Sequence, residues 1–171
     1  MVANLEKGIL DLIITPQMVT SATVEYEAFS KETIVLVGGN TTDENAFNEV
    51  LTLNDPVALE DWLKHQKWYG TTGDMEHLRR FWQLNFGKYP DFRPNYIVPN
   101  LNSIVRCLGS GIGFAVIPDF LCKREIDNGA VKLIWEGSTK LTNILHFATR
   151  KKTMYAEEID VIKKIFKEVM I

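Results

Sequence analysis

Residues 98–120 read VPNLNSIVRCLGSGIGFAVIPDF and place Gly109, Gly111 and Gly113 between two apolar segments. The spacing of Ile104, Val105 and Leu108 predicts a helix before the glycines, and residues 114–117 predict a buried strand after them. In a dinucleotide-binding loop the strand comes first and the helix opens after the glycines. Here the glycines follow the carbonyl end of a helix, where phosphate is repelled. We therefore expect a helix-to-strand turn, with Gly109 as a left-handed helix cap and the other two glycines in the turn.

The segments around this stretch also alternate between strands and helices. A proline after Asp55 predicts a helix start, with the aspartate as N-cap. Residues 40–54 are expected to be a polar loop. Apolar periodicity predicts strands at residues 10–15, 23–29, 33–37, 67–69, 95–98, 131–135 and 144–149, and helices at 75–86, 119–126 and 156–170. The middle of the chain is thus an α/β lobe with a largely parallel sheet.

Composition limits the classes of protein to which the chain can belong. It has 171 residues, of which 46% are apolar, enough for one core or two small lobes. A net charge of -3 argues against a surface that holds a nucleic-acid backbone. No apolar run reaches the roughly 18 residues of a membrane span, and the first residues do not resemble a signal peptide. We expect a cytoplasmic protein with no membrane partner.

The sequence offers no constellation of catalytic residues. Ser110 lacks the glycines that a nucleophile elbow needs two residues away on each side. The three histidines are scattered, so neither a triad nor a metal site is expected, and no cofactor is predicted. Cys107 and Cys122 are interpreted as buried structural thiols, with a redox switch as the less favoured alternative.

Two strand-to-helix joints in the middle lobe are candidate ligand sites. Thr71 and Thr72 follow one predicted strand, and Asn100, Asn102 and Ser103 follow another, behind Pro99. In a parallel sheet such joints lie at the carboxyl ends of the strands, where open α/β folds bind ligands. Free amides and the positive end of a helix dipole favour an anion there. The alternative is that these polar residues only cap their helices.

The ordered set of motifs resembles the effector-binding domain of LysR-type transcriptional regulators. The resemblance covers nearly the whole chain. It is carried by LEKGILDLIIT (residues 5–15), TIVLVGG (residues 33–39) and the stretch from residue 98 to 134, with matching residues Leu5, Gly8, Leu10, Asp11, Leu12, Val105, Gly111, Gly113, Ala115, Pro118, Ile126, Gly129 and Leu133.

The resemblance implies an α/β, two-lobed fold like type 2 periplasmic binding proteins, with mixed sheets and flanking helices. Lobe I would comprise residues 1–38 and 141–171, incomplete at its N-terminal side, and lobe II residues 39–140. A small effector, commonly an anion, would bind in the cleft between the lobes. The family's pocket positions map to Thr15, Pro16, Thr71, Thr72, Pro99, Asn100 and Leu101.

The resemblance also implies partners. DNA would be bound only through an N-terminal winged helix-turn-helix, which the chain does not contain, so we expect a fragment of a longer, non-enzymatic regulator. A strand expected beside residues 10–15 is also missing, and an uncovered strand edge favours a homo-oligomer. The alternative with the same fold is a solute-binding protein of a transport system.

Overall fold

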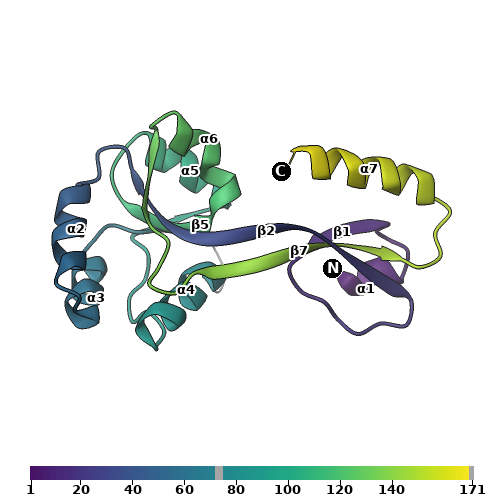
Figure 1. Ribbon diagram of the computed structural model, residues 1–171, viewed down its shortest axis with the longest axis horizontal. Coiled ribbons are helices and arrows are strands. Elements are labelled where there is room, and N and C mark those ends of the chain that lie inside the picture. Colours follow the sequence, from purple (N-terminus) through teal and green to yellow (C-terminus); the bar gives the residue numbers. More distant parts are fainter. Residues whose placement is uncertain (72–74, 170–171) are drawn as a thin grey trace. The chain divides into compact units, whose positions relative to one another are not determined.

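The computed structural model describes residues 1–71 and 75–169 and divides the chain into two compact units (Figure 1). Unit 1 comprises Met1–Glu32 and Thr142–Ile171, and unit 2 comprises Thr33–Leu141. Unit 2 is therefore an insertion in unit 1. Within the described residues, no helix is both long and apolar enough to cross a membrane.

The elements follow one another in an α/β order. Unit 1 begins with α1 (Val2–Glu6), β1 (Leu12–Thr15) and the first part of β2 (Val24–Gly39), and it ends with β7 (Leu141–Arg150) and α7 (Ala156–Val169). The elements between them belong to unit 2: α2 (Glu44–Thr52), α3 (Pro56–Lys64), β3 (Tyr69–Thr71), α4 (Glu76–Phe86), β4 (Tyr96–Val98), α5 (Leu101–Gly109), β5 (Phe114–Pro118), α6 (Asp119–Asp127) and β6 (Val131–Trp135).

The sheets are mixed. A five-stranded sheet has the order β1-β7-β2-β5, with β6 also paired to β2, and β5 and β6 both run antiparallel to β2. β3 and β4 form a parallel pair, and a single parallel bridge joins Trp68 to Phe114. The strands of the predicted alternation, β3, β4, β5 and β6, thus run in one direction as expected, and the long strand β2 enters the lobe against them.

The centre of unit 2 is buried on both faces, and the period of two along each strand sorts its side chains into two cores. Ile34 and Leu36 of β2 pack with helices α2, α3 and α4, together with Trp68, Phe81 and Trp82. Val35 and Val37 face the other way and pack with α5 and α6. Figure 1 shows α5 and α6 on one side of β5 and α4 on the other.

Two local predictions before Asp55 were wrong. The strands expected at residues 23–29 and 33–37 are one strand, β2. Its polar middle stays in the sheet because buried Glu32 accepts a hydrogen bond from Asn143 Nδ2 at 2.7 Å. The expected loop at 40–54 contains helix α2, capped by Asp43, whose carboxylate accepts from two backbone N–H groups. The predicted N-cap at Asp55 is confirmed, with bonds to Val57 N and Ala58 N.

The glycines of the opening stretch serve close packing rather than a helix cap. Helix α5 includes Gly109, and its C-cap is Ser110 at φ -110°, so the predicted left-handed cap at Gly109 was wrong. Gly113 is the residue with positive φ, +128°, and a Cβ there would lie 2.8 Å from the Tyr69 ring. The tightest approach involves Gly39, where a Cβ would lie 1.9 Å from the carbonyl oxygen of Gly111.

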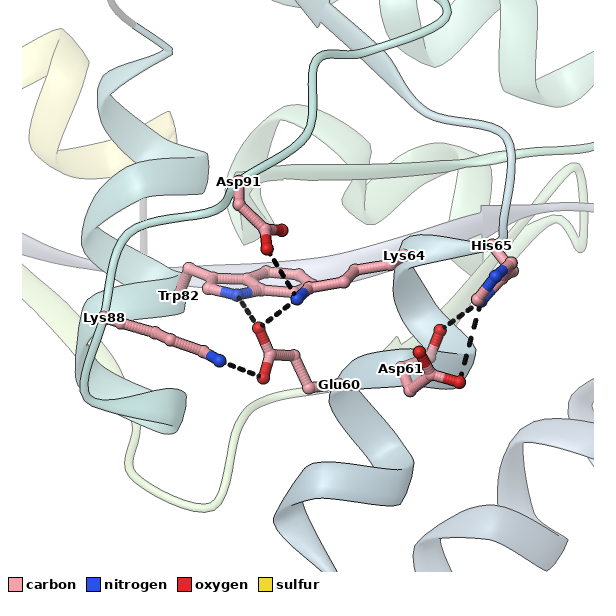
Figure 2. Close-up of polar contacts among 7 residues, drawn as sticks. All are labelled: Glu60, Asp61, Lys64, His65, Trp82, Lys88 and Asp91. Atoms are coloured by element: carbon pink, nitrogen blue, oxygen red, sulfur yellow. Dashed lines mark hydrogen bonds and ion pairs between the residues drawn. The ribbon is translucent and has the colours of Figure 1, made fainter.

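A buried carboxylate joins helices α3 and α4 (Figure 2). Glu60 is 5% exposed, and its carboxylate bonds to Lys64 at 3.0 Å, to Lys88 at 2.8 Å and to the indole N–H of Trp82 at 3.2 Å. Asp91 accepts from Lys64 at 3.0 Å. Burial raises the pKa of Glu60, but the hydrogen bonds from Lys88, Lys64 and Trp82 outweigh it, so the pKa lies below its ordinary value. Every charge of this cluster has a partner, which favours a structural role.

Unit 1 is held together by buried apolar contacts and by paired charges. Phe29 stacks on Phe147 with ring centroids 3.8 Å apart, and Phe147 also meets Phe166 of α7 edge-on. Glu27 accepts hydrogen bonds from Lys167 and Lys163 of α7, and these bonds lower the pKa of its carboxyl group. These contacts fix α7 against β2 and β7.

We predict that Gly39→Ala destabilises the protein, because the added methyl group would overlap the backbone at Gly111 and the turn cannot move without disturbing β5. The expected loss in the free energy of unfolding is about 2 to 3 kcal/mol, measured by urea denaturation. Gly109→Ala is the matched control. A Cβ at Gly109 would meet nothing closer than 3.8 Å, and alanine is favoured within a helix by up to about 1 kcal/mol. Equal losses in the two variants would contradict this account.

We also predict that Glu60→Gln lowers the free energy of unfolding by about 2 kcal/mol at neutral pH, since a neutral amide cannot pair with two lysines. The folded-state pKa of Glu60 is lowered, so its contribution is present above the unfolded-state value, near 4.5, and is lost as pH falls through the folded-state pKa. Denaturation curves between pH 3 and 7 should show the two proteins converging in acid.

The control for the Glu60→Gln experiment is Glu136→Gln, which removes a surface ion pair with Lys140. A change within about 0.5 kcal/mol is expected for it. A difference between wild type and Glu60→Gln that grew as the pH fell would show that the sign of the pKa shift is wrong.

Candidate functional site

Strand pairing brings the two strand-to-helix joints of unit 2 to one edge. β3 and β4 are parallel, with Thr71 opposite Val98, so Thr71 and Pro99 lie side by side where the strands end. Thr72, the other predicted residue of the first joint, lies outside the described residues. The edge formed by Thr71, Pro99, Asn100 and Leu101 is called the β3–β4 half-site below.

Asn100 organises the second joint. It has extended backbone angles, φ -157° and ψ 166°, and its Oδ1 accepts hydrogen bonds from Ser103 N at 2.9 Å and Ser103 Oγ at 3.2 Å. Asn100 is therefore the N-cap of α5, as the capping alternative predicts. The cap does not use every donor, because the backbone N–H groups of Leu101 and Asn102 precede the first residue that can bond within the helix.

The half-site is open to solvent and includes the start of α5. Pro99 and Asn100 are exposed, and Leu101 is half-buried against the core beneath α5. Unpaired N–H groups and the positive end of the α5 dipole favour a carboxylate or a small inorganic anion by about 0.3 to 1 kcal/mol at an exposed position.

The tyrosines of β3 and β4 support this edge from one face of the sheet. Tyr69 and Tyr96 are paired in register and stack with centroids 4.9 Å apart. Burial raises the pKa of Tyr69, and the neighbouring Cys107 and Tyr96 add to the effect. Tyr69 is therefore a neutral, rigid support for the strands whose ends carry the half-site.

Thr15 and Pro16 lie in unit 1, at the end of β1. Thr15 is 7% exposed, and its hydroxyl donates to Gln17 O at 3.3 Å and accepts from Gln17 N at 3.1 Å. Pro16 is exposed. The hydroxyl of Thr15 thus stabilises a local turn, and Pro16 is the more accessible of the two.

The structure adds one residue that sequence reasoning missed. His146 on β7 is paired directly opposite Thr15, so the two side chains share a face of the sheet. Its Nδ1 is buried and has no hydrogen-bond partner within the described residues, while the edge of Tyr26 meets its ring. The sequence carries no signal for this position, because the pairing of β1 with β7 joins residues more than 100 positions apart.

The structure confirms the prediction of a buried thiol for Cys122, whereas Cys107 is only partly buried. Cys122 is fully buried, and its Sγ donates to Asp119 O at 3.3 Å. Burial, with Asp119 nearby, raises the pKa of this thiol to about 12, so it stays protonated and unreactive. Across residues 1–71 and 75–169, no three His, Cys, Asp or Glu side chains gather in a way that could hold a metal ion.

Comparison with known proteins gives the chain a family. The family model described as LysR substrate binding domain matches residues 1–169. The HTH-type transcriptional regulator AbaB of Streptomyces antibioticus is 28% identical over 128 residues, which are 75% of this chain and 41% of AbaB. The chain thus spans about two fifths of the length of this curated relative.

Solved structures show the same fold at low sequence identity. The regulatory domain of CrgA from Neisseria meningitidis, a LysR-type regulator, matches with TM-score 0.67 and 14% identity, covering 98% of this chain and 78% of CrgA. The bromide-bound regulatory domain of HypT from Salmonella typhimurium matches with TM-score 0.67 and 11% identity, covering 98% of this chain and 77% of the HypT domain.

Full-length LysG from Corynebacterium glutamicum, solved with bound effector Arg, gives TM-score 0.67 and 13% identity, with 99% of this chain and 54% of LysG covered. These likenesses confirm the predicted α/β, periplasmic-binding-protein-like fold. With the family model matching almost every residue, the chain belongs to the LysR substrate-binding domain family.

Proposed function

We propose that this chain is the effector-sensing part of a longer transcriptional regulator and that a small anion binds at the β3–β4 half-site. The observation that carries the proposal is the start of α5, where Asn100 caps the helix through Oδ1 and leaves two backbone N–H groups for a ligand. Family membership and the printed description of AbaB as an HTH-type transcriptional regulator support the regulatory role.

The chemistry of the ligands named for two similar structures supports an anionic effector. HypT is described as bromide-bound, and LysG as carrying arginine, which has a carboxylate. Both ligands offer a negative group that a helix start can bind. Thr15, Pro16, Thr71, Thr72, Pro99, Asn100 and Leu101 remain the proposed effector-binding residues, and His146 joins them because of its unpaired Nδ1 next to Thr15.

The relay to DNA needs no chemical step. A ligand that prefers one conformation of the domain shifts the population toward it, and a DNA-binding domain elsewhere in the regulator would respond. Such a regulator works where the DNA is, so we place it in the cytoplasm. The transport alternative is not favoured, because the family and AbaB are regulators.

The test of the half-site is Asn100→Asp. An aspartate keeps the bond to Ser103 N and so keeps the helix cap, but its charge repels an anion. A thermal-shift screen of the 171-residue chain against amino acids, organic acids and halides would first identify a ligand. We expect Asn100→Asp to weaken the binding of that ligand at least about tenfold, measured by calorimetry as a higher dissociation constant. The melting temperature without ligand should change little.

The matched control exchanges the same two side chains at another helix start. Asp55→Asn alters the cap of α3, which lies away from the half-site, and should leave the affinity unchanged. An anionic ligand that bound Asn100→Asp as tightly as wild type would remove the half-site from the proposal.

Homo-oligomerisation is part of the same proposal. Within the described residues, β1 is the end strand of its sheet and pairs only with β7. A free strand edge is a template for pairing with another chain. Light scattering should therefore show a mass above 19.5 kDa that rises with concentration, and a purely monomeric protein at high concentration would contradict it.

A further inference from the structure

Unit 2 contains a second cavity, at the opposite end of the parallel strands from the half-site. It has a volume of about 320 Å³ and is lined by the end of α3, the loop after β2 and the turn before β5. Lys67 and Gly113 line it just before β3 and β5 begin, whereas the half-site lies where β3 and β4 end. Thr71 lies four residue steps beyond Lys67, which is about 13 Å along extended chain, so the two sites are distinct.

The inner wall of the cavity is aromatic and apolar. Trp62 and Phe114 meet edge to face with centroids 5.9 Å apart, and both line the cavity. Ile112, also in the wall, is 51% exposed although it is a large apolar residue. A planar apolar ligand would bury this isoleucine and contact the two rings. Removing apolar surface from water and forming aromatic ring contacts would both favour its binding.

Most polar groups of the wall already have partners. Asp43 Oδ1 accepts from Asn45 N and Ala46 N, Gln66 Nε2 donates to Trp62 O, and Thr41 Oγ1 donates to Gly111 O. The His65 ring is bonded to Asp61 O through Nδ1 at 2.7 Å.

Two groups of the wall are left over. The Lys67 ammonium has no ion-pair partner among the described residues, although the Lys67 backbone is fixed because its carbonyl accepts from Phe114 N at 2.8 Å. Thr42 is 7% exposed, and its hydroxyl has no hydrogen-bond partner in the part of the chain that the structure describes, but the oxygen is itself buried and so is not offered to a ligand. Lys67 therefore gives the wall a cation that can pair with a negative group on the ligand, whereas the Asp43 carboxylate, also in the wall, is held at the start of α2 by two backbone N–H groups.

We propose that this cavity is a second ligand site that binds a small planar aromatic carboxylate. The ring would lie against Trp62, Phe114 and Ile112, and the carboxylate would pair with Lys67. A volume near 320 Å³ is at the lower end of small-molecule pockets, which suits a single-ring or two-ring compound. The site works independently of the β3–β4 half-site.

Benzoate is the probe, titrated into the 171-residue chain by calorimetry and followed by NMR at the indole N–H groups. Lys67→Met keeps the aliphatic stem of the side chain and removes its charge. The substitution should lower the affinity for benzoate by about tenfold or more. Benzyl alcohol, a neutral analogue with the same aromatic ring, should bind wild type and Lys67→Met equally. Lys151→Met, at an exposed lysine of unit 1, is the matched control and should leave benzoate binding unchanged.

A second variant guards against a folding effect at Lys67. Ile112→Asp changes an exposed side chain and places a negative charge in the wall, so benzoate binding should be lost. The proposal is overturned if benzoate does not bind, or if it binds both variants as tightly as wild type. It is also overturned if Asn100→Asp abolishes benzoate binding while Lys67→Met leaves it intact, since benzoate would then occupy the half-site. Failure here leaves the half-site proposal standing.

Discussion

The backbone contact between Gly39 and Gly111 is the constraint on which unit 2 depends. Gly39 ends β2, and its N–H donates to Gly113 O at 3.0 Å, while a side chain at position 39 would collide with Gly111 O. The end of β2 and the turn between α5 and β5 are thus held at backbone distance. Since β5 pairs along β2 from Gly38 to Ile34, this contact sets the register that separates the two cores.

The two ends of unit 2 carry different chemistry because of strand direction. At the carboxyl ends of β3 and β4, a helix begins and presents N–H groups. At their amino ends, α3 finishes and the turn before β5 leaves a hollow with aromatic walls. The paired cluster around Glu60 lies between α3 and α4 and stiffens the helical layer without offering a free charge.

Local signals predicted many of the elements, and non-local pairing explains most of what was missed. The caps at Asp55 and Asn100 and the helix at 75–86 follow from short-range rules, and the structure agrees with them. Residues 72–74, just before that helix, lie outside the described part of the chain. Helix α2 did carry a signal, since Asp43 precedes Phe47, Val50 and Leu51 at helical spacing. The continuity of β2, by contrast, depends on Asn143, whose amide satisfies buried Glu32 from 111 positions away.

The same distinction applies to the sites. Small polar residues after predicted strands pointed to Thr71 and Asn100, and the parallel register of β3 and β4 then brought these positions together. His146 and the cavity beside Trp62 had no comparable signal, because each is assembled from segments distant in sequence. Gly109 was misjudged because glycine at a helix end is common in left-handed caps, whereas here the helix continues through it.

The two hydrogen bonds from Ser103 to Asn100 Oδ1 have a consequence for selectivity. The acceptor oxygen is occupied by the backbone and hydroxyl of Ser103, and the exposed Asn100 keeps an NH₂ group that can only donate. The start of α5 therefore offers hydrogen-bond donors from both side chain and main chain. If this edge binds the proposed effector, a molecule bearing an ammonium group would have to enter with its opposite end first, so that orientation as well as charge would govern binding.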